Sequence, residues 1–163
     1  MTALRRLVTL ALAIACVPGA AAAQMRAGAG AIVERCGAAA GLQLGAQGSS
    51  GSVGGDGLVS VTAEGGVIRE ITVRRAGAFT QRYIVIGQST LGEVLQRYGQ
   101  PTSSRPVGPT LQIDYGYDGI TFLFPYGGSS AALQNDLVVR GATVHPKARR
   151  PDGSIYPCAT AAK

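Results

Sequence analysis

Residues 92–99 read GEVLQRYG, and residues 30–37 read GAIVERCG, so a similar octapeptide occurs twice in the chain. At the same offset of 62 residues, residues 54–58 (GGDGL) align with residues 116–120 (GYDGI). Two matches at one offset indicate a duplicated structural unit. The repetition therefore predicts a fold built from two related halves, and it says little about chemistry.

The second copy has the clearer helical signal. Thr90 and Glu93 fit a capping box, in which the hydroxyl and the carboxylate each accept a hydrogen bond from a backbone N–H group at the start of the helix. Apolar residues recur at helical spacing over residues 91–98, and Gly99 is suited to end a helix. The sequence therefore predicts a helix over residues 91–98.

The first copy has a related pattern. Residues 25–36 are rich in alanine and place Ile32, Val33 and Cys36 on one side of a helix, directly before Gly37. A glycine at this position is typical of a helix end. We therefore expect a short first helix that ends at Gly37.

Runs of β-branched or alternating apolar residues follow each expected helix and are typical of strands. The expected strands cover residues 58–61, 67–73, 111–117, 120–124 and 137–144. Glycine-containing turns join the first two of these strands and also the third and fourth, so each pair is expected to form a hairpin.

These elements predict an α+β fold. Two αββ-type repeats form one antiparallel sheet with two short helices packed on one face, after a cleaved signal peptide. Because one such unit can hardly bury its apolar face alone, we expect the two repeats to share one core. The expected boundaries are 1–23 for the signal peptide, 24–146 for the composite domain (repeat one 27–75, repeat two 89–146) and 147–163 for a polar C-terminal tail.

The first 23 residues have the pattern of a secretory signal peptide. Arg5 and Arg6 form a positive start, and residues 7–16 are apolar but shorter than the roughly 20 residues that span a bilayer. Residues 20–23 are all alanine, which suits cleavage before Gln24. The protein is therefore expected to be periplasmic or secreted.

Cys16 allows a second interpretation of the same segment. Residues 13–16 (AIAC) resemble a lipobox, in which the cysteine is lipidated and becomes the first residue. In that case the protein is an outer-membrane lipoprotein. Membrane contact is expected only if Cys16 is lipidated.

Cys36 and Cys158 remain after signal cleavage. An even number of cysteines in an oxidising compartment indicates a disulfide, and we expect Cys36 and Cys158 to form it. The bond would tie the expected first helix to the C-terminal tail. Two free thiols, or an intermolecular bond through the tail, are the alternatives.

The charge of the chain excludes one class of partner. The chain has 15 Lys and Arg against 9 Asp and Glu, and the basic residues are dispersed along it. Nucleic-acid binding favours a dense basic stripe with stacking aromatic residues. We therefore expect no nucleic-acid partner.

The second copy resembles the BamE-like (SmpA/OmlA) group and the related repeat of β-lactamase-inhibitory proteins. The resemblance is carried by Ser89 to Pro101, by Tyr115 and by Gly119 to Phe124. It implies a helix-on-sheet fold in an exported protein that binds other proteins, in some cases at the outer membrane.

Patterns typical of catalysis are scarce. His145 is the only histidine and lies at the end of an expected strand, so neither a Ser–His–Asp arrangement nor a zinc site of the usual ligands is indicated. Asp56 and Asp118 each precede a glycine and are interpreted as turn residues rather than paired glycosidase carboxylates. Asp114 is expected on the solvent face of its strand, paired with an arginine. We expect no enzyme activity, no cofactor and no metal.

The sequence thus predicts an exported, non-enzymatic protein-interaction module of the bacterial cell envelope, with another envelope protein as its partner. Tyrosine and arginine are enriched at interface hot spots. The candidate surface consists of Tyr117, Tyr126, Arg74, Arg75 and Arg82. A lipid-anchored scaffold in outer-membrane assembly is the first alternative, and a small secreted hydrolase is the second.

Overall fold

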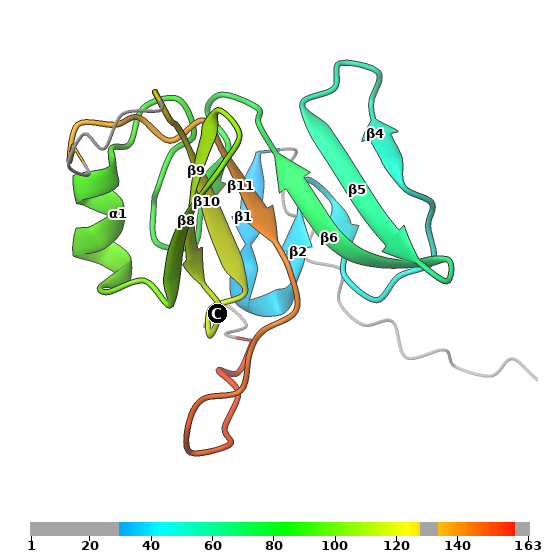
Figure 1. The fold of residues 1–163 in the computed structure, drawn as a ribbon. Coiled ribbons are helices and arrows are strands. Elements are labelled where there is room, and N and C mark those ends of the chain that lie inside the picture. Colours follow the sequence, from blue (N-terminus) through cyan, green and yellow to red (C-terminus); the bar gives the residue numbers. More distant parts are fainter. Residues whose placement is uncertain (1–29, 128–133, 159–163) are drawn as a thin grey trace, which may run out of the picture.

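Two β-sheets and one α-helix make up the computed structural model, which describes residues 30–127 and 134–158. The large sheet is antiparallel and contains, in order across the sheet, β4 (Gly51–Val53), β5 (Val59–Glu64), β6 (Val67–Val73), β11 (Gly141–Val144), β10 (Ile120–Pro125), β9 (Thr110–Tyr115) and β8 (Ser103–Val107) (Figure 1). The small sheet is mixed and contains β3 (Leu42–Gln43), β2 (Ala38–Ala39), β1 (Ala31–Val33) and β7 (Phe79–Thr80). The helical elements are α1 (Leu91–Tyr98) and a short 3-10 helix, η1 (Glu34–Cys36).

Both predicted hairpins are present in the large sheet. β5 pairs with β6 through a turn at Gly65 and Gly66, whose φ angles of 58° and 77° lie in the left-handed region that favours glycine. β9 pairs with β10 in the same antiparallel manner. β11 then lies between β6 and β10 and joins the two hairpins into one continuous sheet.

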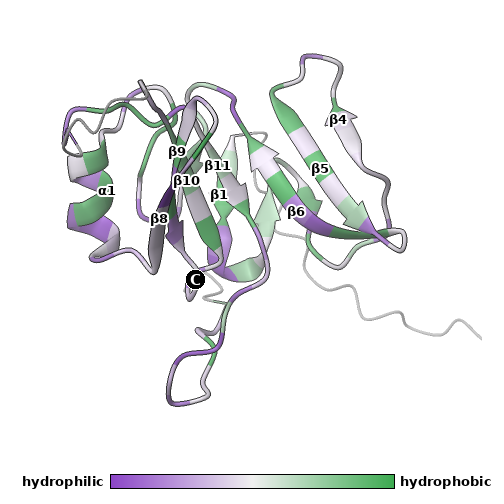
Figure 2. Ribbon diagram, in the orientation of Figure 1, coloured by the Kyte–Doolittle hydropathy of each residue, from purple (hydrophilic) through white to green (hydrophobic). Residues whose placement is uncertain are grey.

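One face of the large sheet forms the core. Strand residues alternate between two faces, and Figure 2 shows this alternation of hydrophobic and hydrophilic residues along β5. The side chains of Ile71, Ile113 and Phe122 are buried in the same cluster as Val94 of α1 and Ile32 of β1. The helix and the small sheet therefore cover the same face of the large sheet.

Helix α1 has the predicted bounds and the predicted cap. The Thr90 hydroxyl accepts a hydrogen bond of 3.3 Å from the backbone N–H of Glu93, and the Glu93 carboxylate accepts one of 3.2 Å from the backbone N–H of Thr90. The Tyr98 ring meets the rings of Phe122 and Tyr115 at centroid distances of 5.0 and 5.1 Å. The helix is thus anchored to β9 and β10 by an aromatic cluster.

The predicted first helix is wrong. Residues 31–33 form strand β1, which pairs with β2 on one side and with β7 on the other, and only η1 is helical. Strand pairing on both sides of β1 buries Ile32, and this tertiary contact overrides the alanine-rich helical pattern. The fold is therefore mostly β with one α-helix in the described residues, and the predicted two αββ repeats are not its architecture.

The predicted disulfide between Cys36 and Cys158 is confirmed, and it links positions 122 residues apart. Such a bond is typical of an exported protein. The predicted signal peptide (1–23) and the lipidation alternative at Cys16 lie outside the described residues. No α-helix in the described part of the chain is long and apolar enough to cross a lipid bilayer.

Candidate functional site

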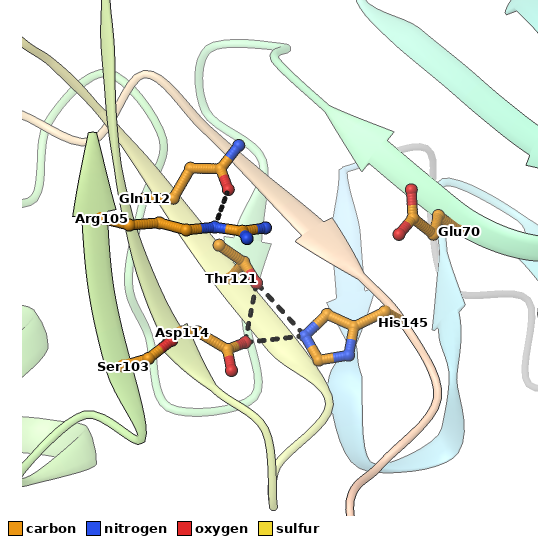
Figure 3. A pocket seen from close by; sticks show the side chains of 7 residues that line it. All are labelled: Glu70, Ser103, Arg105, Gln112, Asp114, Thr121 and His145. Carbon is orange, nitrogen blue, oxygen red and sulfur yellow. Dashed lines mark hydrogen bonds and ion pairs between the residues drawn. The ribbon is translucent and has the colours of Figure 1, made fainter. Parts of the chain in front are cut away.

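A polar groove lies on the face of the large sheet opposite the core. It consists of two adjoining hollows of about 330 and 420 Å³. The two hollows share five lining residues, Glu70, Arg105, Gln112, Thr121 and His145, so they are parts of one feature, which we call the sheet groove. Its walls and floor come from β6, β11, β10, β9 and β8 (Figure 3).

A row of short polar side chains crosses the large sheet, and its members on β6, β11, β10, β9 and β8 form the floor of the sheet groove. Strand alternation places one such residue from each strand in register across the whole large sheet. The row is Ser52, Ser60, Thr72, Thr143, Thr121, Asp114 and Ser103. Neighbouring members bond to each other: the hydroxyls of Thr72 and Thr143 are 2.9 Å apart, and the Thr121 hydroxyl donates to Asp114 Oδ1 at 2.8 Å.

His145 joins this row at the end of β11. Its Nε2 lies 3.0 Å from Oδ1 of Asp114 and 3.2 Å from the hydroxyl oxygen of Thr121 (Figure 3). Its Nδ1 lies 3.0 Å from the backbone oxygen of Pro146, which can only accept a hydrogen bond. Asp114 therefore pairs with a histidine, and the predicted arginine partner for Asp114 is wrong.

These contacts favour the charged form of both side chains. Burial lowers the pKa of His145, but the hydrogen bonds to Asp114 and to the Pro146 oxygen outweigh it, and the net pKa lies above the usual value. Burial raises the pKa of Asp114, but the hydrogen bonds from His145 and Thr121 outweigh it, and the net pKa lies below the usual value. The contact between His145 and Asp114 on the groove floor therefore favours a charged pair.

The geometry of His145 is unsuited to general-base catalysis. In a catalytic triad the carboxylate and the nucleophile bond to different ring nitrogens. Here Asp114 and Thr121 both meet Nε2, and the Pro146 oxygen occupies Nδ1. A ring nitrogen that donates to Asp114 or to the Pro146 oxygen has no free lone pair with which to take a proton from Thr121.

The five residues predicted for a binding surface do not gather in one place. Arg74 is exposed and lines the sheet groove. Arg75 pairs with Asp56 at 2.7 Å near the turn that leads into β5. Tyr117 lies half-buried in the turn between β9 and β10, and Tyr126 packs against the edge of the core.

Arg82, the fifth predicted residue, has a structural role. Its guanidinium lies 4.4 Å from the centre of the Tyr98 ring and bonds to Asp118 Oδ1 at 3.0 Å. Asp118 also accepts a bond of 2.9 Å from Nε of Arg35, so one carboxylate holds two arginines from distant segments. Asp118 lies in a backbone turn as predicted. Its side chain also forms the two ion pairs, which the sequence did not predict.

Glu34 is a buried acid that the sequence reasoning missed. Only 1% of it is exposed, and its carboxylate accepts hydrogen bonds from the Tyr98 hydroxyl at 2.7 Å and from the backbone N–H of Gln81 at 3.2 Å. Burial raises its pKa above the usual value, partly offset by these two bonds. It is the first residue of η1, its side chain is buried, and it lines neither hollow of the sheet groove.

No protein-family model matches this chain, and no curated protein sequence matches it. The chain is similar to a solved structure, the crystal structure of a DUF4309 family protein (YjgB) from Bacillus subtilis subsp. subtilis str. 168. The two share 15% sequence identity over 58% of this chain and 68% of that chain, with a TM-score of 0.38. The expected resemblance to the BamE-like group and to β-lactamase-inhibitory proteins is wrong, because β1 and η1 stand where the first repeat requires a helix.

Proposed function

We propose that this chain is an exported, non-enzymatic binding protein that holds a partner protein on the open face of its large sheet. The observation that supports this most directly is the sheet groove, a polar hollow across five strands that no element of residues 30–127 or 134–158 covers. The apolar residues on the opposite face of the sheet are explained by their packing in the core, whereas core packing does not explain the polar residues of the groove.

The shape and chemistry of the groove favour a protein partner over a small molecule. Sites for small ligands are usually enclosed and largely apolar. The sheet groove is open and is lined mainly by charged residues and hydroxyls. A protein surface can bring many hydrogen-bonding groups to such an area at once.

The site is also poorly equipped for catalysis. The only histidine has an acceptor at each ring nitrogen, Asp114 at Nε2 and the Pro146 oxygen at Nδ1, so neither nitrogen is free to act as a base. Within the described residues, no group of three or more His, Cys, Asp or Glu side chains is placed to hold a metal ion. Both observations favour binding over the hydrolase alternative.

Site-specific crosslinking in the cells that export the protein tests this function. A photoreactive amino acid replaces Thr143 in the middle of the groove, and in a control protein it replaces Gln96 on the exposed side of α1. We expect a defined protein adduct from position 143 and none from position 96. No adduct from position 143, or the same adducts from both positions, contradicts the proposal.

The proposed location is the periplasm or the outside of the cell, with a mature chain that begins at Gln24. The Cys36–Cys158 bond supports export. Intact-mass measurement of the mature protein tests whether the chain begins at Gln24. A mass that corresponds to a start at Gln24 supports it, and a lipidated Cys16 replaces it with the lipoprotein alternative.

A further inference from the structure

Two arginines of the sheet groove form no ion pair among residues 30–127 and 134–158, although Arg105 lies near enough to Asp114 to help lower its pKa. The ion pairs of the described chain use Arg35, Arg69, Arg75, Arg82 and His145. Arg74 and Arg105 are absent from them, although both are exposed and both line the groove. Arg105 bonds only to a neutral side chain, through its Nε to Gln112 Oε1 at 3.3 Å.

The two arginines face each other across three strands. Arg74 follows β6 and Arg105 lies on β8, with β11, β10 and β9 between them, so their backbones are about 19 Å apart at the usual strand spacing. The Arg105 side chain extends inward over β9, where its Nε donates a hydrogen bond to Oε1 of Gln112 (Figure 3). Arg74 leans inward over Gly141: a Cβ atom on that glycine would lie 3.1 Å from Arg74 Cγ.

An apolar centre separates the two cations. Leu123 points to this face of the sheet, opposite the core, yet it is only 6% exposed. Its Cδ1 lies 3.3 Å from the same Cβ position above Gly141, so the aliphatic stem of Arg74 covers it. The groove therefore presents a guanidinium on either side of a covered leucine, and guanidinium groups prefer carboxylates and phosphates as partners.

The far end of the groove has the opposite sign. Glu70 is exposed, points toward the groove, and has no ion pair among the described residues (Figure 3). A ligand that is negative along its whole length would meet Glu70 there. Among the described residues no aromatic side chain lines either hollow, so they supply none of the stacking that usually holds sugars or bases.

From this charge pattern, and resting on the proposed function, we infer that the partner docks a segment of mixed charge into the sheet groove. Acidic side chains of the segment bind Arg74 and Arg105 around Leu123, and a basic side chain of the same segment binds Glu70. A protein segment can carry both signs within a few residues, which a polyphosphate cannot. The hydroxyl row on the floor supplies hydrogen bonds between the two ends.

The test is an NMR titration of the 15N-labelled protein with three probes. The first is the peptide Ac-Glu-Thr-Glu-Thr-Val-Thr-Lys-Thr-NH2, the second is the same peptide with both Glu replaced by Gln, and the third is inorganic tripolyphosphate. We expect the acidic peptide to shift the Nε–H signals of Arg74 and Arg105 and the amide signal of Leu123. The Gln-substituted peptide should bind at least tenfold more weakly, and tripolyphosphate should bind more weakly than the acidic peptide.

Single-charge variants identify the contacts. Arg74→Gln and Arg105→Gln should each weaken the acidic peptide about tenfold, and Glu70→Gln should weaken it through the lysine. Arg69→Gln is the matched control, because it removes the same charge from the same strand, β6. The Arg69 side chain is 52% exposed, and its Nε lies 3.9 Å from Oε2 of Glu64. Unchanged amide spectra of the free variants establish that each is folded.

Three results would overturn this inference. They are equal binding of the acidic and Gln-substituted peptides, an effect of Arg69→Gln as large as that of Arg105→Gln, and tighter binding of tripolyphosphate than of the acidic peptide. The proposed function fails separately: crosslinks from position 143 that persist in the Arg74→Gln/Arg105→Gln protein refute the inference and leave the function standing. The absence of any crosslink refutes the function itself.

Discussion

The hydroxyl of Tyr98 donates a hydrogen bond of 2.7 Å to the carboxylate of Glu34, across 64 residues of sequence. Both side chains are buried, and the bond ties α1 to η1 beneath the small sheet. It is a polar contact inside an otherwise apolar cluster, where an acceptor without a donor is costly.

We expect Tyr98→Phe to lower the free energy of unfolding by about 1–3 kcal/mol, because Glu34 Oε1 loses its donor and stays buried. Urea denaturation followed by circular dichroism measures the change. Tyr83→Phe is the control, because Tyr83 is 72% exposed, and a change within about 0.5 kcal/mol is expected there. Equal effects of the two substitutions would show that the buried bond contributes nothing.

The raised pKa of Glu34 makes stability depend on pH in a defined direction. The folded protein holds the proton on Glu34 more tightly than the unfolded chain does, so the benefit is complete below the unfolded pKa. The free energy of unfolding therefore falls as the pH rises from the ordinary glutamate range through the raised folded pKa. In Glu34→Gln this part of the pH dependence should disappear, and denaturation curves at a series of pH values measure it.

The contributions of His145 and Asp114 to stability should be lost in opposite directions of pH. The folded pKa of His145 is raised, so its contribution to stability is present below the unfolded pKa of about 6.5 and is lost as the pH rises through the folded value. The pKa of Asp114 is lowered, so its contribution is present above the unfolded pKa and is lost as the pH falls through the folded value. NMR titration of the imidazole should give a pKa above 6.5, and Asp114→Asn should return it toward or below that value.

The two Asp-Gly turns should differ in what their carboxylates contribute. The Asp118 side chain is 9% exposed and holds two arginines, whereas Asp56 is exposed and pairs with one. We expect Asp118→Asn to cost about 2–4 kcal/mol of unfolding free energy, and Asp56→Asn to cost clearly less because solvent screens its exposed ion pair. Thermal or urea unfolding of the two variants compares them directly, and a larger cost at Asp56 would contradict the assignment.

Local signals predicted the elements that depend on neighbours in sequence. The capping box at Thr90 and Glu93 and the turn at Gly65 and Gly66 are complete within a few residues, and both occur as predicted. The alanine-rich run before Gly37 is also a local signal, but its outcome depends on β2 and β7, which pair with β1 from elsewhere in the chain. The helical prediction failed there because strand pairing is a long-range contact.

The candidate site was less predictable than the fold. Asp114 and His145 lie 31 residues apart and meet only because β11 and β9 both pair with β10 in a fixed register. The sequence placed Asp114 on the solvent face but gave no means of choosing its partner. Alternation within single strands does predict which residues face outward, so the polar row could have been found once the strand order was known.

The bond between Cys36 and Cys158 turns almost the whole described chain into a covalent ring. A protease that cuts once anywhere between the two cysteines leaves a single molecule of unchanged mass apart from one added water. Such a nicked protein keeps its fragments in place, and they separate only when the ring is reduced. A protein that works outside the cell, among proteases and far from the machinery that would replace it, gains in lifetime from this closed connectivity.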